Sequence, residues 1–465
     1  MKSKFIGGTD GDNRCINMYP EVTVAGKKEP GRMITCPGFA EWLDPGVFGE
    51  VRGGKAASDG NLYAIVKDTV FKIDTNKNTT TLGTIDTTSG PVDPVDNGFQ
   101  LAFADGDKGY CYTYATGVFG QITDLDFPNG TEKIVYTNNF GLAIAPETER
   151  LYISGITALH GDFLIWDALD FTSASVSPDR ATGIEVDYYV MVAGPDSIEQ
   201  FYYDGNADFP FAPVQGAPIK QGCIAPNSLK RFDNSIAWLG GGEGGQGIVW
   251  RLADAVAQRI SNHAIERLIA GWGTPELVRA FTYQQDGHSF YVLFHPTAGH
   301  AVVFDAATNE WHERAGFSKG DFTRWGANCH VAFAGLNLVG HYSNGKIYAL
   351  DKTSYNYDYE YLKILRQWRG PNTEDKRMAL RRMTIDCKAG VGLNSGQGSD
   401  PQLMVRCSAD QGRTWNNERT VSMGRIGQTD KELPVLTRLG TQRDWTWEIS
   451  STDPVEREFN GVYFE

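Results

Sequence analysis

The chain has 465 residues, and its 41% apolar and 22% charged content excludes an intrinsically disordered protein. The formal net charge of −14, with a pI near 5.1, argues against a nucleic-acid binder that uses its general surface, because phosphate neutralisation needs a basic footprint. No apolar run approaches the roughly 18 residues that span a bilayer, and the first residues turn polar too soon for a secretory signal.

Seven cysteines are scattered along the chain, and no two are spaced as a metal or redox motif. We therefore expect reduced, buried thiols in a protein that is made in a cytoplasm.

Short β-type segments separated by Asp-Gly and Asn-Gly dipeptides dominate the chain up to Tyr355. These dipeptides favour the positive φ angles of tight hairpin turns. The segments are LYAIV (62–66), VFKI (70–73), YCYTY (110–114), RLYISG (150–155), VDYYVMV (186–192), IAWL (236–239), IVWRL (248–252), SFYVLF (289–294), AVVF (301–304), HVAFAG (330–335) and KIYAL (346–350).

The segments between Gly60 and Tyr355 group into seven units, with a mean spacing of about 42 residues, which is typical of a four-stranded propeller blade. We predict an all-β fold built on a β-propeller of seven blades, with six as the alternative.

Helix is expected only between blades. Apolar residues from Asp254 to Trp272 follow a 3.6-residue period, and Thr274-Pro275 is a plausible start for a second short helix.

A change of composition after Tyr355 indicates a second domain. The segment 371–400 is polar and Gly-rich, and β-type segments of a sandwich-like unit follow it. These segments are 401–408, 413–422, 443–450 and 461–465. We predict three parts: an extended segment over 1–55 that packs on other domains, the propeller over 56–358, and a C-terminal β domain over 359–465.

The C-terminal part is also the basic part of the chain. Residues 362–425 hold 12 Lys and Arg against 6 Asp and Glu, a net charge of +6. One interpretation is a basic patch that acidic neighbours balance. The other is a docking or DNA-facing surface, for which Arg377, Arg381 and Arg382 are the candidate interface residues.

One specific motif stands in this part, an Asp box with the pattern SxDxGxTW. It consists of Ser408, Asp410, Gly412, Thr414 and Trp415. The aspartate is expected to cap turn amides, and the tryptophan to pack under the loop. Because sialidases hold several such boxes, a sialidase-like glycosidase is an alternative, but a single box outside the propeller favours a structural turn.

Other candidate motifs favour structural roles. The sequence from Gly242 to Gly247 matches the dinucleotide pattern GxGxxG, but strand-like segments flank it on both sides, where the pyrophosphate site needs a helix after it. His295 and His300 are close enough to converge, yet neither a cysteine nor a carboxylate completes a metal set. The pairs Asp105/Asp107 and Asp124/Asp126 have no further calcium-ligand pattern. We therefore predict no catalytic residue, metal or cofactor.

Several long stretches resemble the packaged-DNA stabilisation proteins of podoviruses, which are also called tail accessory factors or tail hub (nozzle) proteins. The resemblance rests on RCINMYPE (14–21), FLIWDALDFTSASVSPDR (163–180), EQFYYDGNADFPFAPVQGAPIKQGC (199–223), RISNHAIERLI (259–269), GHSFYVLFHPTAGHAVVFDAATNEWHER (287–314) and PVLTRLGTQRDWTWEISSTDPV (434–455).

This resemblance implies a structural virion protein and not an enzyme. Members of the family form a ring, typically a hexamer, below the portal and adaptor, help to retain packaged DNA until ejection, and anchor the tail needle and the tailspikes or fibres. The expected location is the virion tail, after synthesis in the host cytoplasm, with DNA passing through non-specifically and with no membrane insertion. A glycan- or receptor-binding propeller of the virion is the other alternative.

Overall fold

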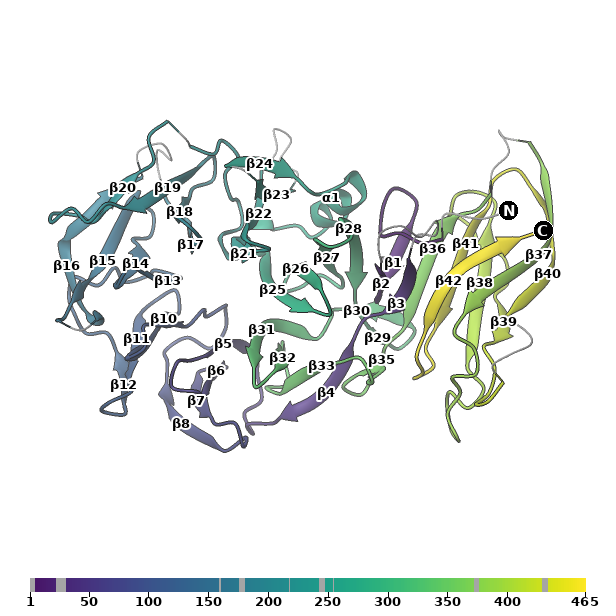
Figure 1. The fold of residues 1–465 in the computed structure, drawn as a ribbon, viewed down its shortest axis with the longest axis horizontal. Coiled ribbons are helices and arrows are strands. Elements are labelled where there is room, and N and C mark those ends of the chain that lie inside the picture. Colours follow the sequence, from purple (N-terminus) through teal and green to yellow (C-terminus); the bar gives the residue numbers. More distant parts are fainter. Residues whose placement is uncertain are drawn as a thin grey trace.

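The computed structural model of the protein describes residues 5–21, 31–158, 160–174, 180–216, 218–241, 247–253, 255–371, 376–428 and 434–465. Within these residues the chain forms a β-propeller and, to its right in Figure 1, a β-sandwich. Both predicted parts of the fold class are therefore confirmed.

The propeller has seven four-stranded antiparallel blades, which settles the choice between six and seven. Blades 1 and 2 consist of β5 (Val51–Ala56), β6 (Leu62–Val66), β7 (Thr69–Ile73), β8 (Thr79–Thr84), and of β9 (Val95–Asp96), β10 (Gln100–Ala104), β11 (Gly109–Thr113), β12 (Val118–Gln121). Blades 3 and 4 consist of β13 (Ile134–Thr137), β14 (Phe140–Ile144), β15 (Arg150–Ile156), β16 (Gly161–Ser173), and of β17 (Gly183–Val186), β18 (Val190–Ala193), β19 (Ile198–Tyr203), β20 (Phe211–Pro213).

Blades 5 to 7 complete the circle. Blade 5 consists of β21 (Lys230–Phe232), β22 (Ser235–Gly240), β23 (Ile248–Ala253) and β24 (Val256–Arg259). Blade 6 consists of β25 (Arg279–Gln285), β26 (His288–Phe294), β27 (Ala301–Asp305) and β28 (Glu310–Arg314). Blade 7 combines β31 (Ala327–Phe333), β32 (Leu336–His341) and β33 (Ile347–Asp351) with β4 (Gly38–Leu43) from the start of the chain, so this early strand closes the propeller.

The hairpins follow from the turn dipeptides. At the turn between β25 and β26, Asp286 and Gly287 have φ angles of 51° and 82°, the pair of positive values that a type I′ turn requires. Apolar side chains from adjacent blades then pack face to face; between blades 1 and 2, for example, Ile65 and Val70 are buried with Phe103 and Tyr110. A single blade cannot bury both of its faces, so the closed circle is the stable unit.

The sandwich has two sheets. One is five-stranded, in the order β2 (Met18–Glu21), β3 (Arg32–Thr35), β42 (Glu458–Phe464), β37 (Met378–Cys387), β40 (Val435–Gln442). The other contains β36 (Ile364–Arg369), β41 (Thr446–Ser451), β38 (Gln402–Ser408) and β39 (Arg419–Ser422). Buried tryptophans 368, 445 and 447 lie in the core between them.

The second sheet does not end at the sandwich. Strand β1 (Arg14–Ile16) pairs in parallel with β28 of blade 6 and antiparallel with β36, which makes one nine-stranded sheet from β25 to β39. The two hairpins β29 (Gly316–Ser318)–β30 (Asp321–Thr323) and β34 (Asn356–Tyr357)–β35 (Glu360–Tyr361) flank this joint (Figure 1). Backbone hydrogen bonds thus connect propeller and sandwich without a break.

Some local predictions were wrong. The helix expected over 254–272 is shorter: residues 256–259 form β24, and helix α1 covers His263–Ala270, because blade 5 needs a fourth strand. Asn262 caps α1 by accepting a hydrogen bond from the Ile265 amide at 3.0 Å. The second predicted helix is one 3₁₀ turn, η2 (Pro275–Leu277); another, η1 (Pro226–Ser228), was not predicted.

Two strand predictions also need correction. The segment 186–192 contains the turn between β17 and β18, and the polar segment 371–400 contains the ten-residue strand β37. The segment 1–55 was predicted to be extended and to pack on other domains. Strand β4, which lies in this range, and β5, which begins in it, belong to propeller blades. Strands β1 to β3 are the part of the range that packs on the sandwich. Among the helices of the described ranges, none is long and apolar enough to cross a membrane.

Candidate functional site

The propeller axis contains a cavity of about 650 Å³ that the innermost strands line with charged side chains. Lys133 of blade 3 contacts Glu185 of blade 4 at 2.7 Å and Asp93 beside blade 2 at 3.6 Å. Lys230 of blade 5 also pairs with Asp93. Burial would raise the pKa of Asp93, but the two ammonium groups hold it well below its usual value.

The remaining blades are connected in the same way. Glu50, just before β5, pairs with Arg279 of blade 6 at 2.6 Å and accepts a hydrogen bond from Asn328 of blade 7 at 2.9 Å. Polar contacts near the axis therefore reach a residue in or beside each of the seven blades. Since the charges at the axis are largely compensated by partners, this site is better suited to holding blades together than to chemistry on a ligand.

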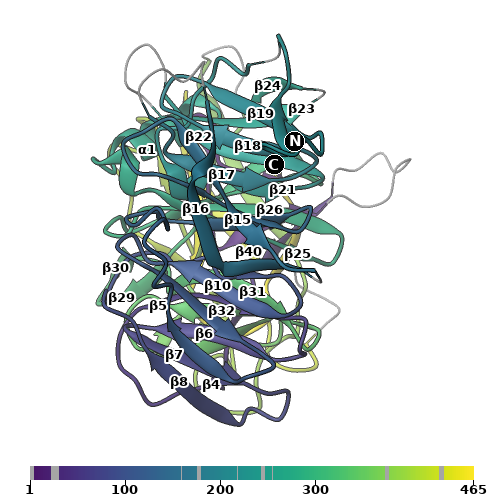
Figure 2. The same ribbon diagram turned by 90° about the vertical axis from the view of Figure 1, so that its left-hand side faces the viewer.

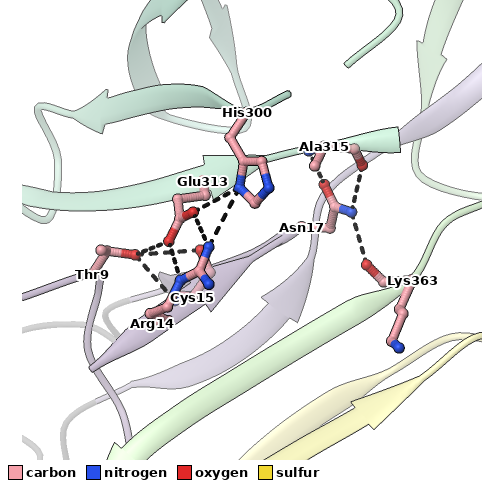
Figure 3. Close-up of polar contacts among 8 residues, drawn as sticks. All are labelled: Thr9, Arg14, Cys15, Asn17, His300, Glu313, Ala315 and Lys363. Atoms are coloured by element: carbon pink, nitrogen blue, oxygen red, sulfur yellow. Dashed lines mark hydrogen bonds and ion pairs between the residues drawn. The ribbon is translucent and has the colours of Figure 1, made fainter. Parts of the chain in front are cut away.

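The joint between propeller and sandwich contains a second polar cluster, centred on Glu313 (Figure 3). This glutamate lies on β28 and its side chain is fully buried. Arg14 of β1 donates to it from Nε at 3.1 Å and from Nη2 at 2.6 Å, and His300 Nδ1 lies 2.8 Å away. Burial would raise the pKa of Glu313, but the His300 and Arg14 contacts lower it, so the carboxylate stays charged.

Asn17 is the central residue of the joint (Figure 3). Its Nδ2 donates to the carbonyls of Ala315, after blade 6, and of Lys363, before β36, both at 2.8 Å. Its Oδ1 accepts from the Ala315 amide at 3.1 Å and from the Tyr357 hydroxyl at 3.3 Å. With a φ of 57°, the residue is in the left-handed region, which asparagine tolerates better than most residues. One buried amide therefore connects three chain segments.

The candidate interface residues Arg377, Arg381 and Arg382 lie on β37 or directly before it, and all three are exposed. Along a regular strand, residues 381 and 382 would point to opposite faces. Here a bulge interrupts the pairing of β37 with β40 between Leu380 and Arg382. The amides of both arginines donate to the carbonyl of Glu465, at 2.7 and 3.1 Å, so the irregular strand exposes both side chains.

The Asp box forms the turn after β38. The Ser408 hydroxyl donates to Asp410 at 2.7 Å, and Asp410 also accepts from the Thr414 amide at 2.8 Å and from the Thr414 hydroxyl at 2.7 Å. These bonds lower the pKa of Asp410 to about 2. Gly412 has a φ of 88°, and the Trp415 ring lies 4.6 Å from the Arg406 guanidinium. Each polar group of the box is used within its own turn.

The other singled-out residues are separate. His295 contacts Thr274, whereas His300 contacts Glu313, so the two histidines do not share a ligand site. Asp105 accepts from the amides of Asp107 and Lys108, and Asp124 from that of Asp126, as turn caps do. The loop 242–246 of the GxGxxG pattern lies outside the described residues, and β23 follows it. Within the described residues, no group of three or more His, Cys, Asp or Glu side chains is arranged to hold a metal ion.

Two family models match the chain, one for each domain and in the same order along the sequence. The model described as "Bacteriophage P22 Gp10, beta-propeller" matches residues 11–355, and the one described as "Bacteriophage P22 Gp10, beta-sandwich" matches residues 363–464. The chain belongs to the bacteriophage P22 Gp10 family. The resemblance to podovirus proteins that stabilise packaged DNA is thereby confirmed, and the chain is a structural phage protein of the tail family.

Solved structures resemble the chain only weakly. A streptogramin B lyase matches with a TM-score of 0.43 and 10% identity, over 67% of this chain and 96% of that chain. Virginiamycin B lyase from Staphylococcus aureus gives 0.44 and 10%, over 67% and 98%, and the N-terminal domain of Nup159 gives 0.40 and 11%, over 73% and 99%. No curated protein matches the chain.

The sequence did not predict the joint. Asn17 lies in a stretch whose family resemblance was noted, yet nothing in that stretch shows that its side chain reaches Ala315 and Lys363. The available signal was an asparagine between two apolar residues, which is compatible with a left-handed residue between strands.

Proposed function

We propose that the chain is a tail hub, or nozzle, subunit that forms a hexameric ring below the portal and its adaptor. In this role the ring closes the DNA exit channel until ejection and anchors the needle and the tailspikes or fibres. The role is mechanical and needs no catalytic residue. The proposal starts from the family membership, and the construction of the molecule supports it.

The observation that carries the proposal is the nine-stranded sheet from β25 to β39. A part that holds pressurised DNA must transmit force between its contacts without hinging. In this chain, Ile16 of β1 pairs with Glu313 on one side and with Leu365 on the other, so the two domains share one sheet. The Asn17 and Glu313 clusters then fix the angle of the joint from within.

Charge supports the same role. A channel through which DNA slides is expected to be hydrated and weakly cationic at most, because each phosphate contact acts as friction. A net charge of −14 per copy agrees with this requirement. The exposed arginines 377, 381 and 382 are then candidates for contacts with acidic protein neighbours.

The direct test adds the full chain to purified portal–adaptor complex and images the product. We expect a ring of this chain below the adaptor, and we expect particles made without the chain to lose their DNA. Full retention of DNA in such particles, together with no ring on the adaptor, would contradict the proposal.

The interface is tested with Arg381→Glu/Arg382→Glu, which we expect to prevent ring assembly. Lys220→Glu/Lys319→Glu is the matched control, since it makes the same charge change at two exposed lysines elsewhere on the surface. Normal rings from the arginine variant would refute the role of these two residues while leaving the hub proposal intact.

A further inference from the structure

The outermost strand of blade 3 is unusually long. Strand β16 has 13 residues, whereas its neighbour β15 has 7. Between its paired residues Trp166 and Phe171, β16 has residues 167–170, where β15 has only Ile153. A second irregularity leaves residues 163–165 without a counterpart on β15. The extra residues project from the blade instead of extending the sheet.

These projecting residues expose apolar side chains. Leu164 is 42% exposed, Ile165 49% and Leu169 83%, although Trp166 between them is buried. Such a cluster adds nothing to the core of its own blade. Several exposed apolar residues close together on one strand are typical of a protein–protein contact.

Three carboxylates flank the apolar side chains along the strand. Asp162, Asp167 and Asp170 lie on β16, which contains no lysine or arginine, and no ion pair joins them to a cation of the described residues. Burial and the nearby Asp167 raise the pKa of Asp170, as expected for a carboxylate close to a like charge. We call Asp162, Leu164, Ile165, Asp167, Leu169 and Asp170 the acidic ridge.

The sandwich carries the opposite charge. Arg377, Arg381, Arg382, Arg438 and Arg443 are exposed on or beside strands β37 and β40, and we call them the basic edge. Within the described residues, none of the five forms an ion pair. Strand β40 is the last strand of its sheet, and Arg438 on it has a φ of 58°. The backbone of this edge is therefore irregular, as it is in β16. A partner is expected to bind its side chains and not to add a further strand to the sheet.

The two surfaces cannot meet within one chain. In Figure 1 strand β16 lies at one end of the longest axis and strands β37 and β40 lie at the other, and in Figure 2 β16 is on the side that faces the viewer. A ring of identical copies needs two different, complementary surfaces on each copy, because its contacts run head to tail. The acidic ridge and the basic edge are two different surfaces, and their charges are complementary.

We propose that the acidic ridge of one copy docks on the basic edge of the next copy, with Leu164, Ile165 and Leu169 forming the apolar centre of the contact. The proposal rests on the proposed ring and names the surfaces that build it. The carboxylates around the apolar centre pair with the arginines of the neighbouring copy. This pairing makes each contact head to tail, with the acidic ridge of one copy on the basic edge of the next.

The test is a charge exchange in the full chain, with association measured by sedimentation and by ring assembly on the portal–adaptor complex. Asp167→Arg/Asp170→Arg and Arg381→Asp/Arg382→Asp should each weaken association by about tenfold or more, the effect of losing close charge pairs. Both pairs of changes in one chain should restore it to within about threefold of the original protein. Glu276→Arg/Asp321→Arg, at two exposed carboxylates elsewhere, is the control and should associate normally.

The docking proposal and the hub proposal would fail with different results. Normal association of the Asp167→Arg/Asp170→Arg variant, or no recovery in the exchanged chain, overturns the docking proposal even if rings form on the adaptor. Charge-dependent association of copies that never join the adaptor overturns the hub function and supports the docking surfaces. If the isolated chain is monomeric, sedimentation cannot compare the variants, and ring assembly on the portal–adaptor complex is compared between the same variants instead.

Discussion

Blades 1 to 5 and the sandwich are both antiparallel β-structures, but the chain builds them in different ways. Each of these blades uses four consecutive strands joined by short turns. The sandwich combines β2 and β3 with strands more than 340 residues later, and β1 extends its other sheet to blade 6. The blades therefore depend on local hairpins, whereas the joint depends on a few buried polar residues from distant segments.

The largest change in stability is expected from a substitution in the joint between propeller and sandwich. Asn17→Ala leaves the carbonyls of Ala315 and Lys363 without their donor, and it places alanine at a positive φ. We expect a loss of about 3–5 kcal/mol in the free energy of unfolding, measured by chemical denaturation. Asn138→Ala is the control, because Asn138 has a φ of 50° but is not part of the joint, and it should cost about 1 kcal/mol. Equal losses of unfolding free energy in the two variants would show that the hydrogen bonds of Asn17 in the joint add no stability beyond the cost of the positive φ.

The next effect concerns Arg314, at the end of β28. This arginine is fully buried among the rings of Tyr283, Phe290 and Trp325, at 5.0–5.4 Å. Truncation to alanine should cost about 3 kcal/mol by leaving a cavity. Arg314→Met fills the space without a buried charge and should stay within about 1 kcal/mol of the original stability. A methionine variant as unstable as the alanine variant would show that the charge itself is needed.

A smaller effect should appear on acidification of blade 7. Burial lowers the pKa values of His330 and His341 to about 4, so the folded protein binds fewer protons than the unfolded chain between about pH 6.5 and 4. Stability is therefore present above this window and falls as the pH decreases through it. At pH 5.5 we expect a loss of about 1 kcal/mol per histidine. Urea denaturation at a series of pH values measures it, and the loss should shrink in His330→Gln/His341→Gln.

The smallest effect should follow Asp410→Asn in the Asp box. The change removes the charge that the Ser408 and Thr414 hydrogen bonds stabilise, at an exposed turn. We expect the melting temperature to fall by no more than about 2 °C, with the ring still assembled. Loss of a glycan-binding or hydrolytic activity in this variant would point to a different role for the box.

The sequence was most informative where structure is local. The seven units and most of their central strands were predicted because turn dipeptides mark the hairpins and because period-2 apolar segments lie between them. Strand β37 was missed because arginines interrupt its apolar pattern, and β24 was assigned to a helix because its residues also fit a 3.6-residue period. The pairing of β4 with β33 and of β1 with β28 joins distant segments, which no local pattern specifies.

The thiols of this chain have a consequence for a particle that leaves the cell. All seven cysteines are unpaired, six of them are buried and Cys329 is half-buried. Burial raises the pKa of the Cys15, Cys111, Cys223, Cys329 and Cys387 thiols to about 12 and also raises those of Cys36 and Cys407. Because only the thiolate reacts readily, we expect these thiols to resist oxidation in an oxidising environment. We therefore expect a virion built from such subunits to age without disulfide cross-links through this chain.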